Sequence, residues 1–83
     1  MASSSDPVII EAAINGGTTK AQNPHVPRGP VKVAADALAC FEAGAAIVHN
    51  HVDRFGLGSP DATADAYLEG WRPVLEARPD ALL

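Results

Sequence analysis

Two short apolar runs flank a single helical pattern, and this order is the feature that most constrains the fold. The first run, VIIEAAI, covers residues 8–14, and the second, AAIVHNHV, covers residues 45–52. Both are shorter than a typical helix and rich in β-branched residues, so we predict two buried strands. Continuous apolar strands are typical of parallel sheets covered by helices. We therefore expect an α/β fold built from strand–helix units.

Helix start and stop signals define the other elements. Gly29-Pro30 starts a helical pattern that Gly44 ends, and Ser59-Pro60-Asp61 repeats the start signal. Gly70 and Pro73 interrupt the second pattern, where they are expected to kink or split the helix. The predicted elements are a strand over 8–14, a loop over 15–29, a helix over 30–43, a strand over 45–52, a helix over 60–77 kinked near 70–73, and the start of a third strand over 81–83.

This βαβα(β) order predicts part of a larger sheet. A complete TIM (β/α)₈ barrel takes about 250 residues, whereas this chain has 83. We expect residues 8–83 to form an incomplete, N-terminal portion of such a barrel, preceded by a disordered tail over residues 1–7. A truncated and inactive fragment is the non-enzyme alternative, and it rests on the length alone.

Charge and composition exclude several functional classes. The formal net charge is −4, and the six Lys and Arg residues are scattered, so no nucleic acid and no membrane surface is expected as a main partner. No apolar stretch approaches the roughly 18 residues of a transmembrane span. The N-terminus MASSSDP lacks signal-peptide features, which favours a cytoplasmic protein. The single cysteine, Cys40, excludes a disulfide framework and a Cys-type zinc finger.

The sequence His49-Asn50-His51 at the end of the second strand is the strongest chemical signal. Side chains alternate along a strand, so both imidazoles lie on one face at its carboxyl end, where functional groups gather in parallel α/β folds. Neutral imidazole suits Zn, Fe or Ni, and a catalytic zinc commonly takes three protein ligands with one position left open. We predict that His49 and His51 are two ligands of a metal ion, with a third ligand from elsewhere. The alternative is that both histidines only form hydrogen bonds at the strand end.

Glu11 is the candidate catalytic residue, because a carboxylate within an apolar strand is costly unless it is paired or used. Alternation places it on the histidine face. It can accept an imidazole N–H, act as a general base, or form a structural pair with a Lys or Arg from elsewhere. The turn Asn15-Gly16-Gly17 is the candidate substrate-binding segment, since its backbone N–H groups can face a carboxylate or phosphate. A flexible turn is the alternative.

Taken together, the segments VIIEAAINGGTTKAQNPHVP, AADALACFEAGA and AIVHNHV resemble the N-terminal part of the β-keto acid cleavage enzymes. The resemblance implies a TIM barrel that binds one divalent metal, usually zinc, and assembles as a homo-oligomer, often a tetramer. It implies transfer of the acyl part of a β-keto acid to acetyl-CoA, giving acetoacetate and a new acyl-CoA. The metal ligands fall on His49 and His51, and the third, a glutamate, lies beyond Leu83.

Two positions depart from the family pattern. The member that cleaves an amino-hexanoate has an acidic residue in the turn where this chain has Gly16-Gly17, which argues against an amino-bearing substrate. The family usually has an aliphatic residue at Asn50, which is expected to face the helices and to need a hydrogen-bond partner. Asp53 and Arg54 can orient ligands or pair with each other, and we assign them no chemistry. The rival function is a metal-dependent hydrolase of the amidohydrolase type, in which the H-x-H pair belongs to the first strand.

Overall fold

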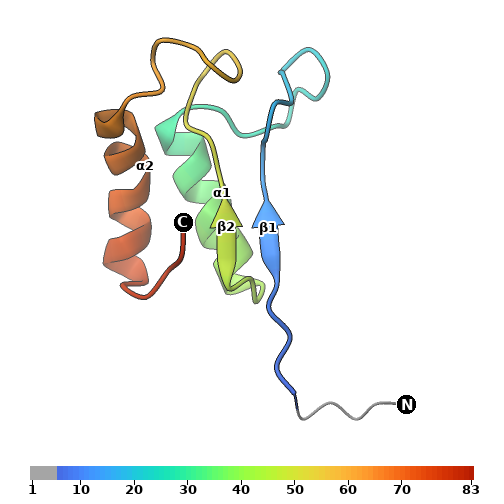
Figure 1. The fold of residues 1–83 in the computed structure, drawn as a ribbon, viewed down its shortest axis with the longest axis vertical. Helices are drawn as coiled ribbons and strands as arrows, with labels where there is room; N and C mark the ends of the chain where they lie inside the picture. Colours follow the sequence, from blue (N-terminus) through green and yellow to red (C-terminus); the bar gives the residue numbers. More distant parts are fainter. Residues whose placement is uncertain (1–5) are drawn as a thin grey trace.

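A computed structural model describes residues 6–83 and contains two strands and two helices in alternation (Figure 1). The elements are β1 (Glu11–Ala13), α1 (Pro30–Glu42), β2 (Ile47–His49) and α2 (Ala64–Ala77). This order confirms the expected α/β class. Most of the predicted N-terminal tail lies outside the described residues. Within residues 6–83, neither helix is long and apolar enough to cross a membrane.

The two strands are parallel and adjacent. Glu11 pairs with Ile47 and Ala13 with His49. On the other side of β2, the predicted third strand is present as a single parallel bridge between Ile47 and Leu82, with Val48 N donating to Leu82 O at 2.9 Å. The chain end therefore lies beside β2, and β2 is the middle of the three segments (Figure 1).

The predicted strands over 8–14 and 45–52 are too long. Each strand has three residues, although hydrogen bonds from Ala46 N to Ile10 O (2.9 Å) and from Ile14 N to His49 O (3.2 Å) extend the pairing at both ends. Val8 is 80% exposed. Among the described residues no segment packs against this apolar N-terminal stretch. The apolar pattern that predicted a strand from residue 8 therefore does not correspond to a paired strand there.

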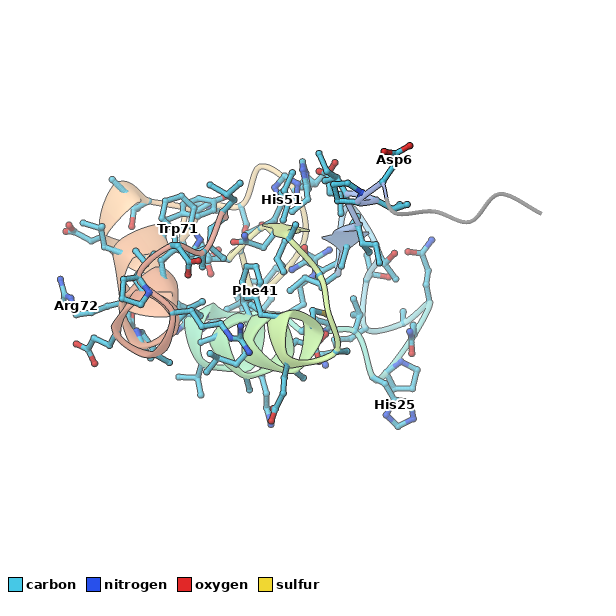
Figure 2. The ribbon with its side chains drawn as sticks, turned by 90° about the horizontal axis from the view of Figure 1, so that it is seen from below. Asp6, His25, Phe41, His51, Trp71 and Arg72 are labelled. Atoms are coloured by element: carbon cyan, nitrogen blue, oxygen red, sulfur yellow. The ribbon has the colours of Figure 1, made fainter. Side chains whose placement is uncertain are left out.

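The core lies between the sheet and the helices. α1 covers one face of the β1–β2 pair, and α2 packs beside α1 (Figures 1 and 2). Phe41 projects from α1 toward the strands and packs with the fully buried Val48 and Val74. The opposite sheet face carries Glu11 and His49, whose side chains are more than half exposed. The structure thus has an apolar covered face and an open polar face.

The second helix begins later than predicted and is not split. Thr63 is the N-cap, and its hydroxyl accepts a hydrogen bond from Ala66 N. The expected helix start at Ser59-Pro60-Asp61 is wrong. These residues form a turn instead, in which the Ser59 hydroxyl donates a hydrogen bond to the Asp61 carboxylate at 2.6 Å. α2 continues through Pro73. Gly70 lies against α1, where a Cβ would be 3.3 Å from the Pro30 carbonyl, so close helix packing supports the turn containing Gly70.

Candidate metal and substrate site

The carboxyl end of β2 brings two imidazoles together. His49 and His51 lie on the sheet face away from α1, with His51 labelled in Figure 2. Their Nε2 atoms are 3.2 Å apart, and the rings meet at an angle of 61°. At this distance the two nitrogens form a hydrogen bond, in which one nitrogen donates and the other accepts. The predicted shared face of the two histidines is therefore observed.

The spacing of these nitrogens fits a shared metal ion. Two nitrogens bound to one zinc at about 2.0–2.1 Å with a tetrahedral angle stand about 3.3–3.4 Å apart. The observed 3.2 Å separation is close to this value. Residues 6–83 contain no group of three His, Cys, Asp or Glu side chains that is able to hold a metal ion. The two histidines alone are therefore not a complete ligand set for a metal within residues 6–83.

Glu11 faces the other nitrogen of the first histidine. Its Oε1 lies 3.8 Å from His49 Nδ1, and both side chains are about half exposed. This distance is too long for a hydrogen bond. Because Nε2 of His49 faces His51, Nδ1 is the ring nitrogen that faces Glu11.

Asn15 joins the two strand ends. It is buried, and its Nδ2 donates to His51 O at 2.6 Å and to Pro27 O at 3.0 Å. Its Oδ1 accepts a hydrogen bond from His51 N at 3.0 Å. The side chain is therefore fully engaged with backbone groups and fixes the position of His51. In the predicted substrate-binding turn, the groups left to contact a substrate are the backbone groups of Gly16 and Gly17.

A buried ion pair supports the same region, and sequence reasoning missed it. Arg28 donates to the carbonyl of Gly16 at 2.7 Å and to that of Thr18 at 2.6 and 3.1 Å. Its Nη1 lies 3.7 Å from Asp53 Oδ1, and both side chains are at most 3% exposed. Asp53 therefore pairs with Arg28, not with the neighbouring Arg54. This pair connects the turn after β1 to the segment that follows His51.

Asn50 points to the helical side, as expected. Its Oδ1 accepts the indole N–H of Trp71 at 2.9 Å, and its Nδ2 donates to Val48 O at 3.0 Å. Both polar atoms of this buried amide are thus satisfied. The unusual residue between the two histidines is explained by Trp71 on α2, which supplies the donor.

The loop between β2 and α2 is organised around Asp61. The Ser59 hydroxyl and the backbone N–H of Arg54 both donate to this carboxylate and hold its pKa below the usual value. The guanidinium of Arg54 lies 3.8 Å away and acts in the same direction. Arg54 therefore pairs with Asp61, and the loop after the histidines has a defined conformation.

Cys40 is a packing residue of the core. Burial raises the pKa of its thiol, and the nearby Asp36 carboxylate adds to this increase. The side chain packs at the edge of the apolar core.

Comparison with known proteins gives one family. The family model of the beta-keto acid cleavage enzyme matches residues 7–83. A 3-dehydrocarnitine:acetyl-CoA trimethylamine transferase from Rhizobium meliloti (strain 1021) is 36% identical over 77 residues, which are 92% of this chain and 26% of that protein. A 3-keto-5-aminohexanoate cleavage enzyme from Acetoanaerobium sticklandii is 35% identical over 77 residues, covering 92% of this chain and 28% of that protein. The chain thus spans about a quarter of the length of these relatives.

Proposed function

Because the chain belongs to the β-keto acid cleavage enzyme family, we propose that the full-length protein exchanges acyl groups between a β-keto acid and acetyl-CoA. The bond between C2 and C3 of the keto acid breaks, and its acyl part joins the CoA sulfur. The acetyl group of acetyl-CoA joins the remaining two-carbon unit, which gives acetoacetate. The family match favours this reaction over the amidohydrolase alternative, in which water is the acceptor.

The observation that carries the proposal is the convergence of the two imidazoles at the carboxyl end of β2. Their Nε2 atoms, 3.2 Å apart on the open sheet face, suit one divalent cation, and we propose zinc. When bound, the cation supplies a Lewis acid that polarises the 3-keto oxygen of the substrate. We further propose that the β1–α1–β2–α2 unit is part of a TIM barrel, in which this open face becomes the interior and the missing ligand comes from a later strand.

Glu11 is proposed to act through His49. Its carboxylate is on the Nδ1 side of that ring, where it is placed to hold the Nδ1 proton and keep Nε2 free as a ligand. This is a positioning role, and a direct role as general base is the alternative at the same position. Asn15 and Arg28 form hydrogen bonds with backbone groups. Asn15 fixes the position of His51, and Arg28 fixes the turn after β1.

The direct experiment is a product assay on the full-length protein. A panel of β-keto acids is supplied with acetyl-CoA, and acetoacetate and acyl-CoA are measured by mass spectrometry. The proposal predicts the two products in equal amounts and, without acetyl-CoA, no consumption of the keto acid beyond its spontaneous decarboxylation in a control lacking the enzyme. Consumption without acetyl-CoA, with release of free carboxylic acids, contradicts acyl transfer and supports the hydrolase alternative.

A variant separates a functional role of Glu11 from a purely structural one. Glu11→Gln keeps the size of the side chain and removes its charge, so turnover is expected to fall by about 10- to 100-fold, the usual effect of losing such an outer partner. Metal content should fall by less than turnover. If only thermal stability changes, Glu11 is a structural residue and has no part in the reaction.

A further inference from the structure

The paired part of the sheet ends before the second histidine. β2 ends at His49, whose carbonyl accepts a hydrogen bond from Ile14 N at 3.2 Å. After Asn15 the chain turns away from the sheet at Gly16, whose φ of +49° lies in the left-handed range that favours glycine. His51 therefore lies beyond β2, and its extended conformation needs a support other than a paired strand.

The side chain of Asn15 takes the place of backbone groups at the next position of the ladder. In parallel pairing the N–H groups of alternate residues point to the same neighbouring strand, so the N–H of His51 points toward β1, as does that of Ile47, which donates to Ile10 O. This N–H donates to Asn15 Oδ1 at 3.0 Å, and the His51 carbonyl accepts from Nδ2 at 2.6 Å. One amide thus binds both backbone groups of His51, as backbone groups of a longer β1 would bind them.

The same amide has no donor left for a substrate. Asn15 is 4% exposed, and its Nδ2 also donates to Pro27 O at 3.0 Å. Both N–H bonds of the amide are therefore used within the protein. The bond to Pro27 ties the end of the loop to the two strand ends, so Asn15 joins three segments of the chain.

The direction of the second imidazole depends on this backbone contact. The flanking residues Asn50 and Asp53 are held by their own side-chain partners. His51 is held through its backbone, which Asn15 binds. Because successive side chains of an extended chain point to opposite faces, a change in the backbone at His51 would move its Nε2 away from that of His49.

We propose that Asn15 is a positioning residue for His51 as a metal ligand. Its amide holds the backbone of His51 in the extended conformation that brings the two Nε2 atoms to a separation of 3.2 Å. This inference rests on the proposed function, since it concerns a ligand of the proposed catalytic metal. It gives Asn15 a role in ligand geometry in place of the substrate-binding role that the sequence suggested.

The test measures the metal affinity of two variants of the full-length protein. Asn15→Ala removes the amide, whereas Asn15→Asp keeps its shape and removes its two donors. The zinc dissociation constant is measured on metal-free protein by competition with a chelator. Both variants should bind zinc about 10- to 100-fold more weakly than the wild type, the usual effect of losing an outer partner of a metal ligand. The visible spectrum of the cobalt-substituted protein, which reports coordination geometry, should also change.

Kinetics at saturating zinc separate positioning from substrate binding. The KM for the β-keto acid should stay within about twofold of the wild-type value while kcat falls, because no contact with the substrate is removed. Asn23→Ala is the matched control. Asn23 lies exposed in the same loop, and its Oδ1 accepts a hydrogen bond from the backbone N–H of His25, which is not a proposed ligand. This variant should keep the wild-type zinc affinity, cobalt spectrum and kinetics.

The inference can fail while the proposed function stands. If the Asn15 variants bind zinc as tightly as the wild type and keep its cobalt spectrum, Asn15 does not position His51. A raised KM then assigns Asn15 to the substrate, and a lower unfolding free energy alone assigns it to the fold. If one variant does not fold, the other decides, and if neither folds, the role is structural and the inference is wrong. If the wild type itself binds no zinc and cleaves no β-keto acid, the proposed function fails as well.

Discussion

Removal of the Arg28 guanidinium should destabilise the protein strongly, because it leaves a buried carboxylate without its partner. Arg28→Met keeps much of the aliphatic stem and removes the charge together with the hydrogen bonds to Gly16 and Thr18. Asp53, which is 1% exposed, is then left in the interior without its ion-pair partner.

The size of the effect follows from burial. Both side chains of the pair are at most 3% exposed, so solvent does not screen the loss. Breaking such a pair from one side costs about 3–5 kcal/mol of unfolding free energy. This is a large part of a typical total of about 5–15 kcal/mol. Removing both charges with Arg28→Met and Asp53→Asn should cost only about 1–3 kcal/mol, because the loop carbonyls are then the main unpaired groups.

The assay is urea unfolding of the full-length protein, with the two single variants and the double variant forming a thermodynamic cycle. The exposed Arg72→Met on α2 is the control and should change the unfolding free energy by less than about 0.5 kcal/mol. A cost below about 1 kcal/mol for Arg28→Met, or additive effects in the double variant, would refute the claim that this pair holds the loop to the histidine strand.

Three further changes test other parts of the structure. Trp71→Phe leaves the buried Oδ1 of Asn50 without its donor and should cost about 1–3 kcal/mol in urea unfolding; no loss means that the hydrogen bond is unimportant. Thr63→Ala removes the N-cap of α2 and should cost about 1 kcal/mol. Asp61, whose pKa is lowered first by the Ser59 hydroxyl, should stabilise the fold fully above about pH 4 and lose this contribution as the pH falls through its lowered pKa. The melting difference from Asp61→Asn should therefore disappear in acid, and a difference independent of pH would contradict this assignment.

Local signals predicted some elements well and failed where tertiary contacts decide. Gly29-Pro30 starts α1 as the sequence indicates, because a fixed proline φ and a missing N–H suit the first helical turn. The similar signal at Ser59-Pro60-Asp61 failed because the Asp61 carboxylate binds the Arg54 backbone, which no short-range pattern reveals. Of the predicted kink or split near residues 70–73, the split is wrong, because α2 is continuous and α1 packs directly against Gly70.

The site divides in the same way. Alternation along a strand is a local rule, so it places Glu11, His49 and His51 on one face correctly. The buried pair of Arg28 and Asp53 joins residues from two different loops, and only the folded chain brings them together.

Metal analysis of the full-length protein tests the central claim most directly. The account predicts about one zinc per subunit in the wild type, and its loss in His49→Ala and in His51→Ala together with loss of acyl transfer to acetyl-CoA. His25→Ala is the matched control, since His25 lies in the exposed loop far from His51 (Figure 2) and should keep both metal and activity. If either strand variant retains its metal, or if acyl transfer continues after the metal is lost, His49 and His51 are not the ligands of a catalytic metal and the account is wrong.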